Sequence, residues 1–487
     1  MTLLEKPNRE AGAATPPSEG DPHPPAVRVT FEGRTLDAIA GETIARALFR
    51  HGIRTLSYSV KFHRPRSVLC ARGRCAACAV EADGVPGVKA CTTPVADGMA
   101  IRRQDYRPPY GPLLTAVARV ARFPAGFYYR HFARPAWVRE RFLASLRRMA
   151  GVGRIDTAGP PRLRPVGPHR SGARLDALAA RYDVAVVGAG LAGMSAALAA
   201  AREGARVLLA EEYAFPGGHA IGALAHAEHA QTRDTLCAEV AAEPSIDLAL
   251  GVTIQGFYPP ATLLAFAGGH GPRDPGTLRR LTAGAVVLAT GALDTIPLFE
   301  NNDRPGVMGA RALRLSLARD GLPLGSRAAI WGDADGVTEL AVLLRAHGIA
   351  VAACAYTDEP GEGVGGVPVV LSEAQLEAIS GREWVSAATF ATRAGRIRVA
   401  CDLVAVAAPG QPAFELAQQA GFAFHLSDGP AHARVLVPTE TRRDVAGTPV
   451  FLAGACAGIS GSHGAWRERI AHARAAGEAA AREVRVG

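Results

Sequence analysis

The stretch that most constrains the fold runs from residue 183 to residue 212 and reads DVAVVGAGLAGMSAALAAAREGARVLLAEE. A short apolar run, Val184–Val187, predicts a buried parallel strand, and the Ala-rich segment Met194–Glu203 has helical spacing. A second apolar run follows and ends at Glu211. Strand, glycine-rich turn, helix, strand and acid therefore come in the order that a dinucleotide-binding βαβ unit requires.

The turn between the first strand and the helix has the pattern G-x-G-x-x-G. Gly188 permits the tight turn, Gly190 lets the backbone approach a pyrophosphate, and Gly193 lets the helix lie close to the strand. Glu211, 23 positions after Gly188, is expected to accept hydrogen bonds from an adenosine ribose. The predicted dinucleotide contacts of this unit are Gly188, Gly190, Leu191, Ala192, Gly193, Glu211 and Glu212.

Two other interpretations of this stretch exist. One is a Rossmann-like unit that has lost its ligand. The other is a membrane span, because residues 184–201 carry no charge over 18 positions. Three glycines and many alanines leave that segment poor in large apolar side chains, so a buried βα unit is favoured.

Four of the eight cysteines cluster with the spacing Cys70-x4-Cys75-x2-Cys78-x12-Cys91. A [2Fe–2S] cluster needs four thiolates around two irons, three of them on one loop that wraps the cluster. The C-x4-C-x2-C loop with a more distant fourth cysteine has that form, so these four cysteines are the predicted metal ligands. Zinc, which prefers paired C-x2-C knuckles, and four free cysteines are the alternatives.

The sequence around the cysteines predicts a β-grasp ferredoxin domain. Alternating apolar and polar residues about Glu32-Gly33 indicate a hairpin, and Glu42–Leu48 reads as a helix that ends near Gly52. Gly73, inside the cysteine loop, permits a turn whose N–H groups can bond sulfur.

Composition favours a globular protein, with 48% apolar and 20% charged residues and a net charge of +9. The positive charge is almost entirely arginine, since the only lysines are Lys6, Lys61 and Lys89. The first 26 residues are polar and Pro-rich, without the apolar core of a signal peptide. Four clustered and four scattered cysteines suit a reducing compartment. We therefore expect a cytoplasmic protein without a nucleic-acid partner.

Three further segments are expected to complete the dinucleotide pocket. A turn containing Gly218 and His219 follows the first unit, and an apolar strand at residues 285–292 ends in Thr290-Gly291. Near the C-terminus, a strand enters Gly454-Ala455, where flavoproteins with two dinucleotide domains normally have Gly-Asp. The missing carboxylate removes an acceptor for ribityl hydroxyls that is worth about 1.5–3 kcal/mol.

A second strand–turn–helix–strand pattern begins at Ala328, but its turn, residues 332–336, lacks the middle glycine. Asp333 and Asp335 would repel a pyrophosphate, so this unit has the expected fold without the usual nucleotide grip. The chain is expected to return to the first unit near Leu403.

The expected fold is α/β, a two-domain dinucleotide-binding flavoprotein of the glutathione-reductase-like type with an N-terminal β-grasp ferredoxin domain. Residues 105–150 interleave arginines with aromatic side chains, which favours packing between domains over a membrane-surface or nucleic-acid-binding role and leaves membrane association open. The predicted organisation is a disordered tail (1–26), a [2Fe–2S] domain (27–104), a helical packing segment and linker (105–181), an FAD- or NAD-binding domain in two parts (182–300 and 403–487) and an inserted second Rossmann-like domain (301–402).

Over about residues 27–487 the chain resembles the α subunit of heterotetrameric sarcosine oxidase. The resemblance rests on SYSVKFHRPRSV, AGFYYRHFARPAW, the glycine-rich unit and, most specifically, VLATGALDTIPLFENNDRPGVM at residues 287–308. Sarcosine oxidase α subunits like this one lack the cysteine set and carry a folate-binding C-terminal half. The cysteines move the resemblance towards hydrogen cyanide synthase, opine oxidase and dye-linked proline or hydroxyproline dehydrogenases, and we expect no folate chemistry.

The resemblance implies a non-covalent dinucleotide at the glycine loop and a catalytic flavoprotein β subunit that oxidises an amine or amino acid. It leaves FAD and NAD open at that site. We favour FAD, because flavin converts two-electron to one-electron transfer and can therefore serve a [2Fe–2S] cluster.

The leading hypothesis is an electron-transferring subunit of an amine or amino-acid dehydrogenase or oxidase. The alternatives are a self-contained NAD(P)H-dependent reductase and a non-catalytic dinucleotide-binding scaffold for the catalytic subunit. The sequence identifies no catalytic base.

Overall fold

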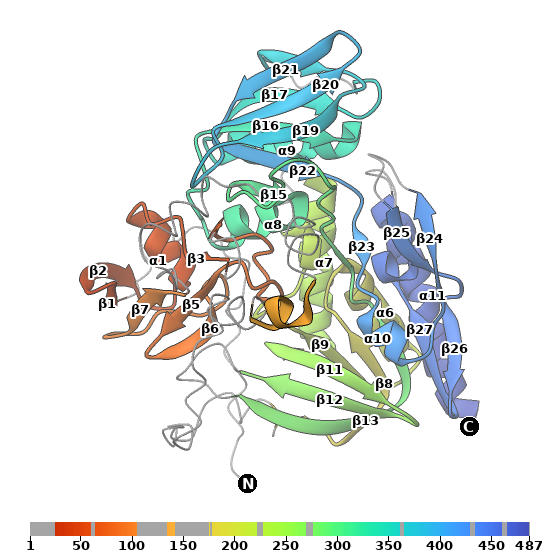
Figure 1. Cartoon of the computed structure of the whole chain (residues 1–487). Coiled ribbons are helices and arrows are strands. Elements are labelled where there is room, and N and C mark those ends of the chain that lie inside the picture. Colours follow the sequence, from red (N-terminus) through yellow and green to blue (C-terminus); the bar gives the residue numbers. More distant parts are fainter. Residues whose placement is uncertain are drawn as a thin grey trace.

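The computed structural model describes residues 25–59, 64–104, 134–141, 175, 178–221, 227–268, 276–360, 365–428, 434–459 and 465–486. Figure 1 shows three lobes: the N-terminal residues on one side, a lobe rich in strands at the top, and a larger lobe that carries the C-terminal helix. Residues 1–24 of the predicted tail and nearly all of the basic aromatic segment and linker lie outside the described residues, whereas Ala26, predicted to be in the tail, begins the first strand.

The N-terminal lobe is the predicted β-grasp unit. Its sheet has the order β2-β1-β7-β5-β6, and the hairpin turns at Glu32 and Gly33, which both have positive φ. Thr43 caps the helix, because its hydroxyl accepts the N–H of Arg46 at 3.2 Å. The elements are β1 Ala26–Phe31, β2 Arg34–Ile39, α1 Ile44–Arg50, β3 Ser57–Tyr58, β4 Pro65–Arg66, β5 Ala79–Ala82, β6 Val85–Lys89 and β7 Ala100–Arg103.

The large lobe is built on a sheet of order β10-β9-β8-β13-β12-β11, with β27 beside β13 and β26 beside β27. Strands β10, β9, β8, β13 and β27 run parallel, as the βαβ pattern predicts, while β11 and β12 form an antiparallel extension of β13. The first part of this lobe comprises β8 Arg181–Val187, α6 Leu191–Arg202, β9 Val207–Glu211, η1 Gly218–Ala220, α7 Ala227–Ala242, β10 Ile246–Leu250, β11 Val252–Tyr258, β12 Thr262–Ala267, β13 Thr277–Leu288 and β14 Ala292–Leu293.

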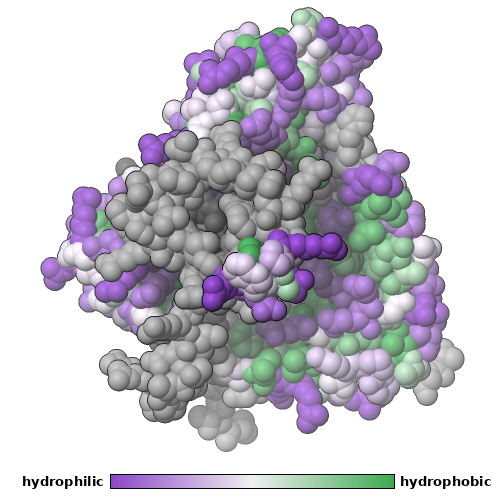
Figure 2. Space-filling view, in the orientation of Figure 1, coloured by the Kyte–Doolittle hydropathy of each residue, from purple (hydrophilic) through white to green (hydrophobic). Residues whose placement is uncertain are grey.

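The C-terminal part of the chain completes the large lobe. It comprises β23 Gln411–Pro412, α10 Glu415–Gln419, β24 Phe424–Asp428, β25 Arg434–Pro438, β26 Arg442–Val445, β27 Thr448–Leu452, η4 Gly454–Ala457 and α11 Ala465–Val486. Hydrophobic residues visible in Figure 2 gather on this side of the molecule around β24 and β25, whereas the upper lobe is mainly hydrophilic. No helix among the described residues is long and apolar enough to cross a membrane.

The upper lobe has a parallel sheet of order β15-β22-β16-β17-β18 covered by a three-stranded sheet, β19-β20-β21. Its elements are β15 Val307–Gly309, α8 Ala310–Arg314, the π-helix η2 Leu315–Arg319, β16 Arg327–Gly332, α9 Ala334–Ala346, β17 Ala350–Tyr356, β18 Val369–Leu371, β19 Gln375–Ser380, β20 Ala387–Thr392, β21 Gly395–Ala400 and β22 Leu403–Ala407. The strand–turn–helix–strand pattern expected from Ala328 is present as β16, α9 and β17.

The predicted return of the chain to the first unit at Leu403 differs from the structure. Strand β22 lies between β15 and β16 in the upper sheet, with Ala405 paired to Ile330 and Met308. The chain therefore crosses to the large lobe only after Ala407. A five-residue apolar strand fits the interior of either parallel sheet, so its composition does not decide which sheet it joins.

Helix α11 packs along α6, behind the glycine loop. The close approach depends on Gly477, where a Cβ would lie 2.1 Å from the carbonyl oxygen of Ala196. The Ala-rich composition of both helices allows this separation, because small side chains let helix backbones come close together.

We expect Gly477→Ala to destabilise the protein by roughly 1–3 kcal/mol, because the added methyl group overpacks the α6–α11 contact. Alanine is a better helix former than glycine by about 1 kcal/mol, so helix propensity alone predicts that Gly477→Ala stabilises the protein. The measurement is the free energy of urea unfolding, with the exposed helix position Ala475→Gly as a propensity control. A Gly477→Ala variant more stable than the native protein would contradict this packing.

Candidate functional site

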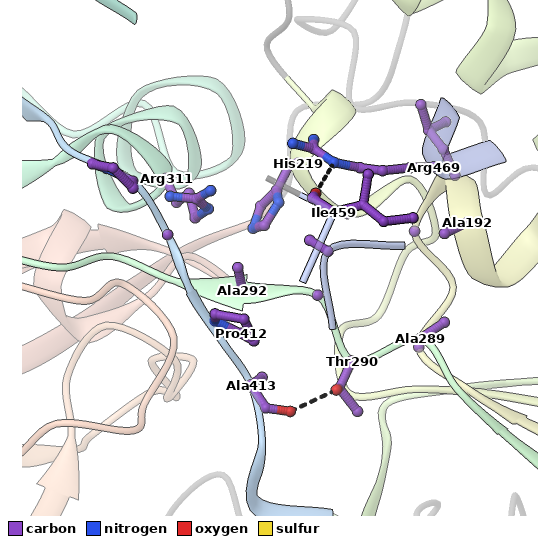
Figure 3. A pocket seen from close by; sticks show the side chains of 18 of the residues that line it. Ala192, His219, Ala289, Thr290, Ala292, Arg311, Pro412, Ala413, Ile459 and Arg469 are labelled. Atoms are coloured by element: carbon purple, nitrogen blue, oxygen red, sulfur yellow. Dashed lines mark hydrogen bonds between the residues drawn. The ribbon is translucent and has the colours of Figure 1, made fainter. Parts of the chain in front are cut away.

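A cavity of about 1140 Å³ lies where the three lobes meet. Its walls come from the glycine loop before α6, from Arg72 and Arg74 of the cysteine loop, and from the β16–α9 turn. Figure 3 shows its interior, with segments from the large lobe and from the first turn of α8 facing one another. The predicted residues that line it are Gly188, Gly190, Leu191, Ala192, Glu211, Glu212, Gly218, His219, Thr290, Gly291 and Ala455.

The glycine loop has the geometry that a pyrophosphate needs. Gly188 has φ 103°, and a Cβ there would lie 2.4 Å from the oxygen of Ala289. At Gly193 a Cβ would lie 1.7 Å from the oxygen of Gly188, so this glycine packs the helix against the turn. A Cβ at Gly190 would have no atom closer than 3.9 Å, which leaves open space beside the backbone. Helix α6 begins there without a side-chain cap, so its first N–H groups are free for phosphate oxygens.

Glu211 lies at the end of β9 and is buried. Its carboxylate accepts the N–H of Ala189 at 2.7 Å and the N–H of Tyr213 at 3.0 Å. Each oxygen keeps a lone pair, so the carboxylate can still accept a ribose hydroxyl. Burial raises the pKa of Glu211 to about 7, although both backbone hydrogen bonds act in the opposite direction.

The remaining predicted residues support the cavity in different ways. The hydroxyl of Thr290 donates to the oxygen of Ala413 at 2.9 Å and so anchors the segment after β23 (Figure 3). Gly454 lies behind the cavity, where a Cβ would come within 2.6 Å of the Ala192 side chain. Ala455 lines the cavity with a methyl group, so this position supplies no carboxylate.

Basic side chains that the sequence analysis missed surround His219. In Figure 3, His219 lies between Arg311 and Arg469, and the Nε of Arg469 donates to the oxygen of Ile459 at 2.8 Å. The pKa of His219 lies well below its usual range, mainly because the side chain is buried. Nearby positive charges lower it further, from Arg311, Arg72, Arg314 and Arg469. His219 is therefore neutral at pH 7. These residues are far apart in sequence and belong to no motif, so no local pattern indicates that they converge.

The turn between β16 and α9, residues 332–336, is stabilised by contacts with α9 and the upper sheet. Asp333 caps α9 by accepting the N–H of Gly336 at 2.7 Å. A Cβ at Gly332 would lie 2.3 Å from the oxygen of Ala407, so this glycine serves strand packing. Asp333 and Asp335 both line the cavity, and their carboxylates face any ligand that approaches from this side.

The four predicted cluster cysteines lie together. Their thiols make hydrogen bonds within the pairs Cys70–Cys75, Cys70–Cys91 and Cys78–Cys91. No three His, Cys, Asp or Glu side chains in the described ranges surround a position for a single metal ion. These contacts link all four thiols in the order Cys75, Cys70, Cys91 and Cys78, and a two-iron cluster needs four such thiolates close together.

The cysteine loop directs N–H groups at sulfur, as Gly73 predicts. Ala71 and Gly73 both have positive φ, and a Cβ at Gly73 would lie 3.0 Å from the Thr92 hydroxyl. The N–H groups of Arg72 and Cys75 donate to the Cys70 sulfur, each at 3.4 Å. Such bonds favour a thiolate, and hydrogen bonds from Cys75 and Cys91 hold the pKa of Cys70 far below its ordinary value. The loop therefore fits a thiolate-bound cluster.

Two family descriptions match the chain in these regions. The "2Fe-2S iron-sulfur cluster binding domain" matches residues 25–106, and "FAD dependent oxidoreductase" matches residues 183–244. Sarcosine oxidase subunit alpha of Rhizobium meliloti (strain 1021) is 32% identical over 418 residues. The chain is a homologue of the sarcosine oxidase α subunit. Its matches to a [2Fe–2S] domain and to an FAD dependent oxidoreductase confirm the predicted cofactors and the predicted resemblance.

The homology covers 80% of this chain but 40% of the Rhizobium subunit. Sarcosine oxidase subunit alpha of Corynebacterium sp. (strain U-96) is 30% identical over 361 residues, covering 72% of this chain and 32% of that relative. The chain thus spans less than half the length of these relatives. The crystal structure of L-proline dehydrogenase from P. horikoshii has the same fold, with a TM-score of 0.59 and 21% identity over 90% of this chain and 70% of that one.

We expect Glu211 to contribute a stability to the cofactor-free protein that falls as pH rises from about 4.5 to 8, while His219, whose pKa folding lowers, acts in the opposite direction below its ordinary pKa of 6.5. Folding raises the pKa of Glu211 from 4.5 to about 7, so the native state binds more protons than the unfolded state in this range. The stabilisation is complete below about pH 4.5 and is lost as pH rises through about 7, and it amounts to roughly 3 kcal/mol.

Urea unfolding at several pH values tests this expectation. Glu211→Gln should remove the loss of stability with rising pH, whereas the exposed control Glu239→Gln should leave it unchanged. An unaltered pH slope in Glu211→Gln would show that another group is responsible.

Proposed function

We propose that this chain is the electron-transferring subunit of a multi-subunit amine or amino-acid dehydrogenase or oxidase. The observation that carries the proposal is the shared wall of the two cofactor sites. Arg72 and Arg74 belong to the loop that holds three of the four cysteines, and both also line the dinucleotide cavity. Two redox groups bound at these positions would be neighbours within one chain.

In this proposal Cys70, Cys75, Cys78 and Cys91 ligate the [2Fe–2S] cluster. Cys70 with Cys75 and Cys78 with Cys91 would each supply two thiolates to one iron. Cys78 and Cys91 are fully buried, whereas Cys70 and Cys75 are partly accessible, so one side of the cluster faces the protein interior.

FAD is proposed to lie in the cavity, with its pyrophosphate at Gly188, Gly190 and the first turn of α6 and its ribose at Glu211. Bound FAD accepts two electrons together and releases them singly, which a one-electron cluster requires. The protein supplies backbone N–H groups at the phosphates and a neutral His219 beside Gly291, whose Cβ position lies 3.8 Å from the imidazole.

The amine is proposed to react in a partner, a catalytic flavoprotein β subunit. Two observations support this division. The homologues are named as subunits of sarcosine oxidase. Burial and the surrounding arginines hold the pKa of His219, the histidine of the predicted ring end, well below its usual range, which makes it a weak base.

The NAD(P)H-dependent reductase is less well supported, because Asp333 and Asp335 present carboxylates where a second dinucleotide would place its phosphates. The scaffold hypothesis gains from Ala455 but does not account for the converging thiols. Isolating the chain with its native partners and adding sarcosine or proline without oxygen separates the three. Amine-dependent reduction of the cluster in the complex, followed by electron paramagnetic resonance, and none in the chain alone, supports the electron-transfer subunit. Flavin bleaching in the complex without reduction of the cluster supports the scaffold. Bleaching of the isolated chain by NADH or NADPH contradicts it.

We expect Cys75→Ser to abolish the [2Fe–2S] electron paramagnetic resonance signal while FAD remains bound at the native ratio. Loss of one thiolate leaves an iron under-coordinated, but the glycine loop is untouched. Cys237→Ser is the matched control, because the Cys237 thiol contacts the Met194 sulfur at 3.8 Å and no cluster cysteine. A native signal in Cys75→Ser would contradict the ligand assignment.

A further inference from the structure

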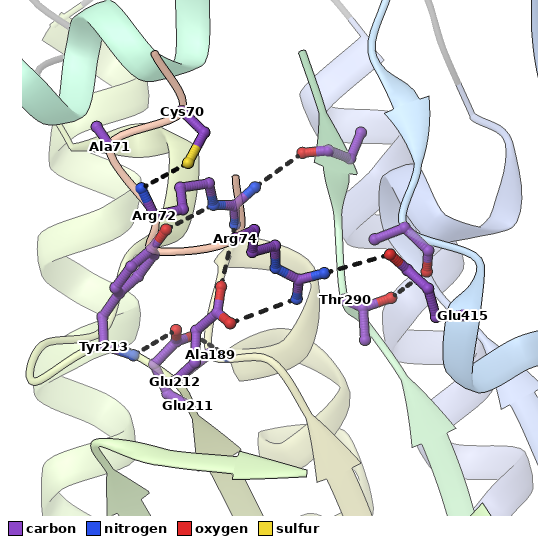
Figure 4. A network of polar contacts seen from close by, with 12 residues as sticks. Cys70, Ala71, Arg72, Arg74, Ala189, Glu211, Glu212, Tyr213, Thr290 and Glu415 are labelled. Carbon is purple, nitrogen blue, oxygen red and sulfur yellow. Dashed lines mark hydrogen bonds and ion pairs between the residues drawn. The ribbon is translucent and has the colours of Figure 1, made fainter. Parts of the chain in front are cut away.

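Arg72 connects the cysteine loop to the dinucleotide cavity. Its N–H donates to the Cys70 sulfur at 3.4 Å, and its side chain, only 12% exposed, crosses into the large lobe. There the guanidinium donates to the Tyr213 hydroxyl at 2.5 Å and to the oxygen of Ala292 at 3.1 Å, and it pairs with Glu212 at 3.5 Å. Figure 4 shows these contacts converging on one side chain.

A second arginine, Arg319, also connects Tyr213 to the cysteine loop. The guanidinium groups of Arg72 and Arg319 lie 5.6 and 5.7 Å from the centre of the Tyr213 ring. Arg319, at the end of η2, donates to the oxygens of Ala71 and Cys91 at 2.9 and 3.4 Å. The Tyr213 ring also stacks on the Phe215 ring, with 5.4 Å between the ring centres, and this contact restrains it. Small movements of this ring would therefore reach the cysteine loop at two points.

The contacts continue from Tyr213 to the glycine loop. The N–H of Tyr213 donates to Glu211, and the other oxygen of Glu211 accepts the N–H of Ala189, inside the G-x-G-x-x-G turn (Figure 4). Hydrogen bonds, joined through the side chains of Arg72 and Tyr213, thus connect the Cys70 sulfur with the backbone that would hold a pyrophosphate. Glu211 and Tyr213 are buried, so water does not compete for these bonds.

We infer that Arg72, through Tyr213, couples the reduction potential of the cluster to the occupation of the dinucleotide cavity. Arg72 acts as a positioning residue: its side chain, held by the large lobe, sets where its N–H lies relative to Cys70. Hydrogen bonds to the ligating sulfurs help to set the potential of iron–sulfur clusters. A ligand that orders Glu211 and the glycine loop would order the Cys70 hydrogen bond too, and by reciprocity the reduced cluster would change the affinity for that ligand.

Arg74, two residues further on the same loop, provides the contrast. Its side chain is 39% exposed and pairs with Glu212 at 3.3 Å and Glu415 at 3.4 Å. It joins the same lobes, but only through exposed ion pairs, which contribute at most about 1 kcal/mol. If a positive charge between the two lobes were sufficient, Arg74 would couple the two cofactor sites as strongly as Arg72 does.

The test is a redox titration of the full chain, in which the cluster is followed by electron paramagnetic resonance, with FAD bound and after FAD is removed. The native protein should show a cluster potential that shifts when FAD binds. Arg72→Gln should lose most of this shift and have a more negative potential with FAD bound, because a nearby positive charge and an ordered N–H both favour the reduced cluster. Tyr213→Phe, which keeps the ring and removes only the hydroxyl, should lose part of the shift. Arg74→Gln should retain it.

An FAD-dependent shift of native size in both Arg72→Gln and Tyr213→Phe would overturn the coupling. So would equal losses in Arg72→Gln and Arg74→Gln, because they would assign the effect to general charge. Because the inference rests on the proposed cluster ligands, native protein without a cluster signal would refute the proposed function itself. Native protein whose cluster potential does not change when FAD binds would refute only the coupling.

Discussion

The buried contact between Arg72 and Tyr213 is the interaction on which the arrangement of the two cofactor sites depends. A guanidinium removed from water costs several kcal/mol unless charged and hydrogen-bonding partners replace the solvent. Arg72 finds them in Glu212, the Tyr213 hydroxyl and a backbone oxygen, and Arg319 finds Asp320 at 2.5 Å. Most of these partners lie outside the N-terminal lobe, so that lobe satisfies its loop arginine only when docked on the rest of the chain.

The dinucleotide cavity combines two opposite electrostatic surroundings. Backbone N–H groups, a neutral His219 and Arg469 line the cavity on the large lobe, whereas the upper lobe contributes Arg311 together with Asp333 and Asp335. With alanine at position 455, no carboxylate from the last βα connection faces the ligand. We therefore expect the large lobe to hold FAD mainly through backbone dipoles, and the acidic turn of the upper lobe to disfavour a second dinucleotide.

The sequence predicted the features that depend on residues close together in the chain. The G-x-G-x-x-G turn and the C-x4-C-x2-C loop each need particular residues at fixed short spacings. The first connects β8 to α6 in the described structure, and the second brings its cysteines close together. The contacts between lobes were beyond prediction, because Arg72 and Tyr213 are 141 positions apart and belong to no common motif. The strand beginning at Leu403 was assigned to the wrong sheet, since its apolar residues suit both. The arginines around His219 meet only through the tertiary fold.

A stoichiometric reductive titration of the purified chain without oxygen tests the central claim most directly. FAD takes two electrons and a [2Fe–2S] cluster takes one, so the account predicts about three electrons per chain. Flavin absorbance and the cluster signal should then change together as electrons redistribute between the two groups. Two electrons or fewer per chain, or a cluster that stays oxidised while flavin is fully reduced and only fills through an added mediator, would contradict electron transfer within this subunit.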